Sequence, residues 1–459
     1  MSSPSEPSNR DDRENEVWPY EEGIDGQTVA APDVTGRGLS SLRPFHYRNY
    51  FLLWSGGMVS VIGSWMQTVA VGALVVAHTG SATWAVVIAA GGFLPIGLLS
   101  PIGGALADRI ARRPALVAGN LLAGVVALAI ALLVAAGRDS PVILTLLVTL
   151  QGSVSAAVGP FQQAILPDLV PPSEFLAAAS LNSAQFNLGR VIGPALAGAT
   201  IAAFGYPVAF VANAVSFLAV VVALFFVHLA PPPGRADESG LLVSLRAGVR
   251  AARSEPGCRA ATSTIALVAL TASPFIALVP VMAHRLTHSG ARGIASATGL
   301  LTTAQGLGAV VGAVAIAPLA LRFGRGRVLT ASLGLLPPVL VLYGFAPSLA
   351  FALPALLLVG LVYIGVLSGL STVVQLRAPV EVRGRVLSLY LVALGVSYPI
   401  GSLVQGPLAD RLGLAWTTAG TAILLAIALA VARVLRPQAF HALTDPSAKE
   451  VSARAVGGL

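Results

Sequence analysis

The stretch Leu106–Ala118, LADRIARRPALVA, lines up with Leu319–Ala331, LALRFGRGRVLTA, at an offset of 213 residues. Each is a short basic segment set between two long apolar runs. Further matches between the segments Pro171–Gly205 and Pro379–Gly413 share one offset of 208 residues. Apolar sequence of low complexity produces chance matches, but two blocks at nearly one offset, each in the same place relative to its neighbouring runs, predict two homologous halves.

Long apolar runs surround these segments. The chain is 55% hydrophobic and 10% charged, with a mean hydropathy of +0.81, whereas a soluble domain carries roughly 25% charged residues. A helix needs about 20 mostly apolar residues to cross a bilayer, and membrane barrel strands are shorter and alternate in polarity. Twelve runs meet the helical requirement, at residues 51–77, 84–107, 114–136, 141–165, 175–203, 206–229, 260–282, 294–320, 327–346, 349–374, 384–409 and 414–435.

Basic residues mark one side of the membrane. If both termini lie in the cytoplasm, the segments on that side hold 23 of the 28 lysine and arginine residues, and the outer loops hold four. Cytoplasmic loops of membrane proteins carry such an excess of positive charge. We therefore expect an even number of helices and two cytoplasmic termini. The net charge of +8 follows from these loops and does not indicate a nucleic-acid partner.

One long inner segment, at Pro231–Arg259, divides the twelve runs into two sets of six. Its stretch Leu241–Arg253 is amphipathic and basic, which is typical of a helix lying on the inner leaflet. The predicted fold is an all-α membrane protein of two six-helix bundles related by a pseudo-twofold axis normal to the membrane, a plan of secondary transporters. The predicted regions are a disordered cytoplasmic tail (1–40), the first bundle (41–229), a cytoplasmic linker (230–259), the second bundle (260–436) and a cytoplasmic tail (437–459).

Arg190 is the one lysine or arginine that lies in the middle of a predicted span and not at its end. It lies roughly 22 Å into the fifth helix, near mid-membrane, where an unpaired charge is costly and must face the protein interior. The predicted spans hold no Asp or Glu at comparable depth, so backbone carbonyls, the amides of Gln185 or Asn187, water or an anionic substrate must neutralise it. Two interpretations stay open: an arginine that ties the fifth helix to a neighbour, and one that lines a substrate cavity.

Several functional classes find no support in the sequence. A phosphate loop requires a Gly-Lys-Ser/Thr sequence, and the single lysine, Lys449, is followed by Glu450. Zinc-protease, Cys-x-x-Cys and Gly-x-Ser-x-Gly motifs are absent, and the one cysteine, Cys258, cannot form an intrachain disulfide. We therefore expect no enzyme activity, no cofactor and no metal site. A receptor or channel suits twelve repeat-related spans less well than a transporter.

Two segments resemble the major facilitator superfamily, over about residues 43–436. Gly103–Pro114, GGALADRIARRP, is similar to the superfamily's inner-loop signature G-x-L-x-D-R-x-G-R-R, and departs from it at Ala111, where glycine is common. Gly189–Gly198, GRVIGPALAG, is similar to the glycine–proline signature of its exporters. With the first helix and the LPDLV segment before the fifth, the resemblance extends to the efflux branch that contains the enterobactin exporter and macrolide efflux proteins.

The resemblance implies a gate at the inner end of the second helix. Asp108 there would face the N-terminus of the eleventh helix, where a carboxylate is favoured, and the neighbouring arginines offer it fork-shaped partners. Such a latch would favour the outward-facing state; the alternative is that these residues only set topology and a tight turn. The gating set is Gly104, Asp108, Arg109, Arg112 and Arg113. A bend in the fifth helix that shapes the seam is assigned to Gly189, Gly193, Pro194 and Gly198.

The resemblance also implies a central cavity lined by the first helix. Polar residues in the spans are its candidates, although each alone is more often an interhelical hydrogen bond. The predicted substrate cavity residues are Gln67, Gln185, Arg190, Gln305 and Tyr398, with Gln151, Gln162, Gln375 and Gln405 as further polar positions.

The expected function is secondary transport by alternating access, with export of a small amphiphile such as a siderophore, antibiotic or drug; the alternative is a nutrient importer or a lipid transporter of the same fold. We expect a monomer in the bacterial cytoplasmic membrane, with the lipid bilayer and a small-molecule substrate as partners. Protons are the candidate coupling ion. Without a mid-span acid, proton coupling would rest on a histidine or on Asp108, Asp168, Glu174 or Asp410.

Overall fold

The computed structural model describes residues 40–107, 110–227, 250, 252–287, 289–379 and 382–444. The N-terminal half consists of six long helices, preceded or joined by three short helical turns. The long helices are α1 (Arg48–Thr79), α2 (Ala82–Ala107), α3 (Arg112–Ala135), α4 (Pro141–Ala164), α6 (Phe175–Phe204) and α7 (Tyr206–Phe226). The short turns are η1 (Ser40–His46), α5 (Leu166–Leu169) and η2 (Pro172–Glu174).

The C-terminal half repeats this arrangement with one interrupted span. Its elements are α9 (Pro256–Thr271), η3 (Ser273–Ile276), α10 (Val279–Leu286), α11 (Gly290–Phe323), α12 (Arg325–Gly344), α13 (Leu349–Arg377), α14 (Arg383–Leu412), α15 (Leu414–Leu435) and α16 (Pro437–Thr444). With α9, η3 and α10 counted as one span, the described residues form the twelve predicted spans. The predicted ends lie within four residues of the observed ones, which confirms the predicted fold class.

Length and composition alone identify ten of the twelve spans. The helix α6 is long enough at 30 residues, but polar residues such as Gln185, Asn187 and Arg190 lower its hydropathy. The other exception is the predicted continuous helix over 260–282, which is wrong in detail. The chain passes through the 3-10 turn η3 in its middle, because Pro274 has no amide hydrogen to continue the α-helical ladder.

Parts of the predicted organisation lie outside the described residues. They are the tail 1–40 apart from its last residue, most of the linker 230–259 with its amphipathic stretch, and the end of the tail 437–459. The helix α9 begins at Pro256, inside the predicted linker, and α16 occupies the start of the predicted C-terminal tail. The domain boundaries therefore stay predictions.

The helices alternate in direction, so the molecule has two distinct ends. We name the basic end after Arg48, Arg112, Arg325 and Arg383, which begin α1, α3, α12 and α14. The opposite end, the Asp410 end, holds the last turn of α14. Two tight hairpins occur there: one residue joins α6 to α7 and α14 to α15, and these residues, Gly205 and Gly413, have φ of 88° and 84°, values that glycine adopts most readily.

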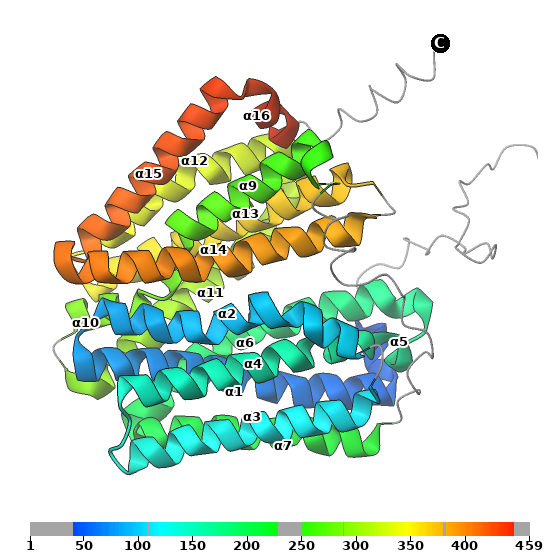
Figure 1. The fold of residues 1–459 in the computed structure, drawn as a ribbon, viewed down its shortest axis with the longest axis vertical. Coiled ribbons are helices and arrows are strands. Elements are labelled where there is room, and N and C mark those ends of the chain that lie inside the picture. The colour runs from blue at the N-terminus through cyan, green and yellow to red at the C-terminus, as the bar shows by residue number, and fades with distance from the viewer. Residues whose placement is uncertain are drawn as a thin grey trace, which may run out of the picture.

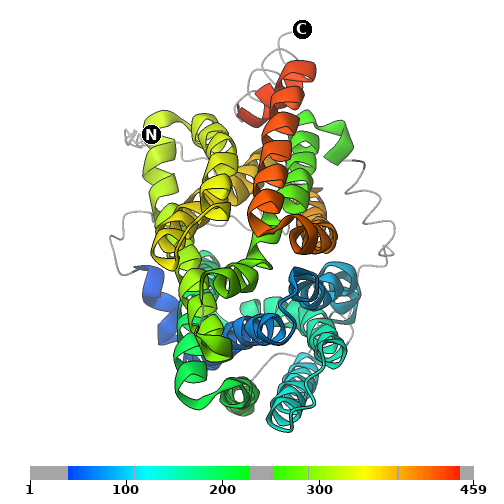
Figure 2. The ribbon, with the colours of Figure 1, turned by 90° about the vertical axis from the view of Figure 1, so that its left-hand side faces the viewer.

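The two halves lie one above the other (Figures 1 and 2). They meet mainly where α2 lies beside α14 and where α6 lies beside α11. Glycines allow this close approach: a Cβ atom on Gly299 of α11 would lie 2.5 Å from the carbonyl oxygen of Pro194 in α6. Because the neighbouring backbone cannot yield easily, larger residues there would hold the halves apart.

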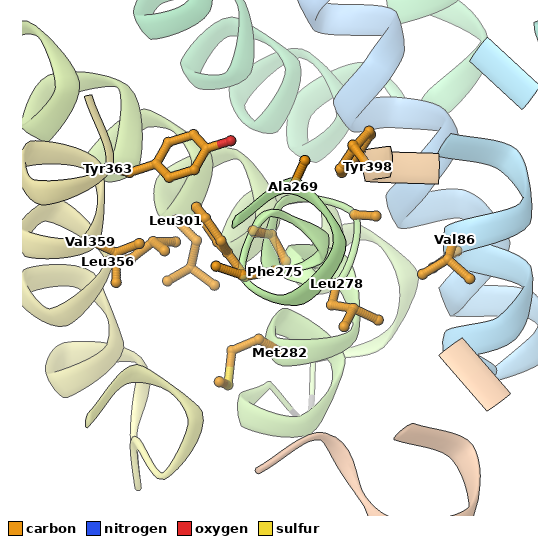
Figure 3. Close-up of a cluster of buried hydrophobic side chains, with 14 of the residues drawn as sticks. Val86, Ala269, Phe275, Leu278, Met282, Leu301, Leu356, Val359, Tyr363 and Tyr398 are labelled. Atoms are coloured by element: carbon orange, nitrogen blue, oxygen red, sulfur yellow. The ribbon is translucent and has the colours of Figure 1, made fainter. Parts of the chain in front are cut away.

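One apolar core joins the halves around the interrupted span. Figure 3 shows Phe275, Leu278 and Met282 from this span between Tyr363 on one side and Val86 and Tyr398 on the other. On the outside of the molecule, large apolar side chains such as Leu321 and Leu176 are 89% and 78% exposed. An apolar exterior of this extent is stable only in lipid.

Candidate functional site

A cavity of about 220 Å³ lies between α1, α2, α4 and α7 and is closed by residues of η3, α10 and α14. Its wall combines apolar side chains with uncharged polar and aromatic ones. The polar and aromatic lining residues are Ser64, Trp65, Gln67, Thr68, Phe93, Gln151, Ser155, Asn213 and Tyr398. Such a wall suits an amphiphilic molecule that needs a few hydrogen bonds and a large apolar contact.

Gln67 is fixed in this wall by α7. Its Oε1 accepts a hydrogen bond from Nδ2 of Asn213 at 2.7 Å, and Ser216 Oγ lies 3.1 Å from Oδ1 of Asn213. The two helices come close here because Gly63 faces Ser216 and Asn213 without a side chain. Gln67 therefore belongs to a buried polar network, with 6% of its surface exposed.

Gln151 lies in the same cavity wall, and its side-chain oxygen accepts no hydrogen bond from the described residues. This oxygen, Oε1, is buried. Close packing of α4 on α2 positions it, since Gly152 lies against the backbone of Gly92. A buried acceptor without a donor is unfavourable, so this oxygen is available to a hydrogen-bond donor on a ligand or to water.

Tyr398 of α14 belongs to the C-terminal half and lines the cavity opposite the N-terminal helices. Its ring packs edge-to-face on Phe93 of α2, with 5.4 Å between ring centroids. Nearby, a Cβ atom on Gly97 of α2 would lie 3.3 Å from the carbonyl carbon of Gly395 in α14. The cavity wall therefore includes the seam between the halves.

Arg190 lies directly behind this wall. Its guanidinium carbon is 5.9 Å from the ring centroid of Trp65, and Trp65 both lines the cavity and packs on Phe186 with centroids 5.7 Å apart. Within the described residues, Nε of Arg190 is buried without a hydrogen bond. Arg190 itself is not among the residues that line the 220 Å³ cavity.

The other two predicted cavity residues also lie outside this lining. Nε2 of Gln185 donates a hydrogen bond to the carbonyl oxygen of Trp54 at 2.6 Å and so joins α6 to α1. Gln305 is 1% exposed, and its carbonyl oxygen lies against Gly360 of α13. Its Nε2 is buried and has no hydrogen bond among the described residues.

The glycine–proline segment of α6 faces two neighbours. Gly189 lies against Val61, and a Cβ atom on Gly193 would lie 2.7 Å from the carbonyl oxygen of Ile62, so both residues let α6 pack closely on α1. Pro194 and Gly198 face α11 instead. The bend predicted for this helix stays a prediction.

At the basic end, Arg112 and Arg113 contact residues of their own half. Nη1 of Arg112 lies 2.8 Å from Oδ2 of Asp168, and Arg113 donates to the carbonyl oxygen of Phe225 at 3.1 Å. A Cβ atom on Gly104 would meet nothing within 4 Å. Asp108 and Arg109 lie outside the described residues.

At the other end, Asp410 caps the start of α2 across the seam. Its carboxylate accepts hydrogen bonds from the hydroxyl of Ser81 (2.8 Å), the amide of Ala82 (2.6 Å), and the amide (3.0 Å) and hydroxyl (2.5 Å) of Thr83. The sequence offered Asp410 only as one of several acids near a membrane face. A signal for it existed, because LADR occurs at both Leu106–Arg109 and Leu408–Arg411.

No group of three or more His, Cys, Asp or Glu residues that could hold a metal ion occurs within the described ranges. The carboxylates there are Asp139, Asp168, Glu174, Glu255 and Asp410, and each lies near or beyond a helix end. The cavity therefore offers binding contacts and no cluster of acids and bases for covalent chemistry.

Comparison with known proteins agrees with this picture. The chain is 26% identical to the multidrug efflux pump Tap of Mycolicibacterium fortuitum over 369 residues, 79% of this chain and 90% of the relative. It is 23% identical to macrolide efflux protein A of Streptococcus pyogenes, over 83% and 94% of the two chains. Its fold matches the inward-facing, unoccupied crystal structure of a bacterial homologue of the human lysosomal transporter Spinster, with a TM-score of 0.65, 16% identity, and coverage of 86% and 97%.

The family model described as "Transmembrane secretion effector" matches residues 39–456, which is most of the chain. This match, the twelve-span architecture and the relatives all indicate a multi-pass membrane transporter. The chain belongs to the transmembrane secretion effector family of the major facilitator superfamily.

Proposed function

We propose that this protein exports small amphiphilic molecules from the bacterial cytoplasm by alternating access, as a monomer with both termini in the cytoplasm. Two relatives named as efflux proteins, which align over most of their length, support export. The excess of lysine and arginine in the segments of the basic end supports this orientation. The basic end is then the cytoplasmic face of the cell membrane.

The observation that carries the proposal is the set of hydrogen bonds that join the two halves at the Asp410 end. At the Asp410 end, Asp410 binds the first turn of α2, and Tyr206 donates to the carbonyl oxygen of Ala291 at 2.8 Å. At the basic end, the ion pairs Arg112–Asp168 and Arg377–Glu255 each lie within one half. A molecule joined at one end can open and close its central cavity by rocking the halves.

We propose that a carboxylate at each end of the molecule caps the start of the facing helix, one cap in each of the two states. The helices α2 and α14 are antiparallel neighbours. The sequence LADR begins at Leu106, the penultimate residue of α2, and occurs again near the end of α14 at Leu408–Arg411. Asp410 of α14 caps α2 in this structure, whereas Val382, the N-cap residue of α14, makes no side-chain cap hydrogen bond. In the alternate state, Asp108 would cap α14, with Gly104, Arg109, Arg112 and Arg113 forming the surrounding gate, and the cap at Asp410 would open.

Protons are the proposed coupling ion, and Asp410 is the carboxylate best placed to respond to them. Protonation removes the negative charge that favours its position at the N-terminus of α2, and it leaves one oxygen a poorer acceptor. The hydrogen bonds between the halves would weaken, and the Asp410 end would open. Proton binding from outside would then be linked to release of the exported molecule.

The direction of transport is tested by accumulation of radiolabelled fusidic acid, an amphiphilic carboxylate, in cells that express the protein. We expect lower accumulation than in empty-vector cells, and loss of the difference when an uncoupler collapses the proton gradient. A matched variant, Tyr398→Ala, should restore accumulation at equal membrane abundance because it opens the cavity wall. Higher accumulation in expressing cells would identify an importer and contradict the proposal.

A further inference from the structure

We propose that Arg190 forms an anion site beside the central cavity, so that the transported amphiphile carries a carboxylate or a similar anionic group. The inference rests on the proposed function, since it concerns the molecule that the cavity accepts. It assigns charge selectivity to a residue that the 220 Å³ cavity does not itself include.

The first observation is that Arg190 has no carboxylate partner within the described residues. It lies midway along α6, and the described carboxylates all lie near or beyond helix ends. Within the described residues, its guanidinium group contacts the face of the Trp65 ring. An uncompensated charge in the membrane interior is a functional signal, because lipid and protein both disfavour it.

The second observation is that neighbouring polar groups are donors. The backbone of α11 touches that of α6 here, since a Cβ atom on Gly306 would lie 3.1 Å from the carbonyl oxygen of Arg190. The adjacent residue, Gln305, has a buried Nε2 without a hydrogen bond among the described residues, as has Nε of Arg190. Two buried N–H donors without acceptors, on facing helices, suit an anion with several lone pairs.

The third observation concerns access and shape. Arg190 is half-buried, and the ring of Trp65 that it covers lines the cavity. In the other half, Oγ of Ser273 in the interrupted span lies 2.8 Å from the hydroxyl oxygen of Tyr363. A molecule whose apolar body fills the cavity could therefore extend an anionic group over Trp65 to the planar guanidinium, which matches a carboxylate in two hydrogen bonds.

The competing explanation is structural: the guanidinium group only holds α6 against Trp65 of α1. The two explanations differ in what a neutral side chain does. Loss of a structural contact lowers stability and weakens binding of every ligand alike, whereas loss of an anion site weakens binding of anions alone.

The test uses fluorescein and rhodamine 6G, which share a xanthene ring system and carry opposite charges at pH 8. Binding to the purified full-length protein is followed by fluorescence anisotropy. We expect fluorescein to bind at least fivefold more tightly than rhodamine 6G. Arg190→Gln should weaken fluorescein binding at least tenfold and change the dissociation constant of rhodamine 6G by less than twofold. Arg190→Lys, which keeps the positive charge, should change the dissociation constant of fluorescein by less than threefold. The control is Arg411→Gln, which removes a positive charge at the end of α14 and should leave the affinities of both dyes unchanged.

Equal affinities in the parent, absence of binding by fluorescein, or equal loss of both dyes in Arg190→Gln with a lowered melting temperature would each overturn the anion site. Export is measured separately by the accumulation of fusidic acid, which carries a carboxylate. Failure of export with intact dye selectivity contradicts the proposed function alone, and normal export without dye selectivity contradicts the anion site alone.

Discussion

Asp410 and Thr83 lie 327 residues apart in the chain, yet the carboxylate of Asp410 accepts hydrogen bonds from both the amide and the hydroxyl of Thr83. One residue belongs to the last turn of α14 and the other to the first turn of α2, so the contact joins the two halves. The N-terminus of a helix carries amides without hydrogen-bond partners and a partial positive charge. A carboxylate accepts hydrogen bonds from these amides and is attracted by the partial charge. The closure of this end thus has a specific chemical cause.

Replacing Asp410 with Asn should shift the protein toward the state that is open at this end. The loss of the negative charge at the N-terminus of α2 costs up to about 1 kcal/mol, which corresponds to roughly a fivefold change in population. The measurement is the rate at which N-ethylmaleimide labels Ser296→Cys, a half-buried position at the seam near Gly198. The rate should rise about fivefold, while Arg411→Gln leaves it unchanged. An unchanged rate in Asp410→Asn would show that the cap does not hold this end closed.

Two glycines of α11 should respond differently to substitution by alanine. Gly299 faces the other half at Pro194, whereas Gly308 lies against the backbone of Leu357 in its own half. Overpacking costs about 1–3 kcal/mol. In Gly299→Ala the halves can separate to relieve it, so labelling at Ser296→Cys should rise while the melting temperature holds. Gly308→Ala should lower the melting temperature instead. The same fall in melting temperature for both variants would argue against a mobile seam.

The two glutamines of the cavity wall provide a second contrast. Gln67→Leu leaves the buried Nδ2 of Asn213 without its acceptor, which should cost roughly 1–3 kcal/mol. Gln151→Leu removes an oxygen that already lacks a donor among the described residues, so stability should hold or rise while fusidic acid efflux changes. Thermal unfolding and efflux assays on both variants check this. Equal destabilisation would mean that Gln151 is paired in the native protein.

The ion pair between Arg112 and Asp168 should stabilise the N-terminal half. Both side chains are largely buried, at 10% and 12% exposure, and hydrogen bonds to charged groups contribute about 1.5–3 kcal/mol. Asp168→Asn should therefore lower the melting temperature, and the swap of Arg112→Asp with Asp168→Arg should recover part of the loss. Lack of any recovery would indicate that each residue acts through other neighbours.

Much of the fold follows from the sequence because apolar runs of about 20 residues leave few alternatives in lipid. The interruption at Ser273–Ile276 escaped prediction because Pro274 lies in an apolar run, where tertiary contacts decide between a kink and a break. Gln67 and Tyr398 were predicted for the cavity and lie in its wall. Gln185 was also predicted there, but it binds the backbone of Trp54. The sequence does not reveal which face of a helix turns toward a partner.

The proposed role of Asp410 depends on a contact between distant segments of the chain. The local sequence therefore does not distinguish Asp410 from Asp168 or Glu174 as a candidate for proton coupling. Asn213 is likewise not among the polar positions predicted for the cavity, although its side chain holds Gln67 in place through a hydrogen bond. Arg190 was recognised from its depth alone. Its position behind Trp65, next to a second donor without an acceptor, required the arrangement of α1, α6 and α11.

Alternating access is tested most directly by pulsed electron resonance distances at both ends of the same protein. Spin labels at Arg138→Cys and Ser348→Cys report the Asp410 end, and labels at Ala111→Cys and Arg325→Cys report the basic end; the natural Cys258 is buried. In Asp410→Asn we expect the first distance to lengthen and the second to shorten relative to the parent. Two distances that stay fixed, or that change in the same direction, would contradict alternating access.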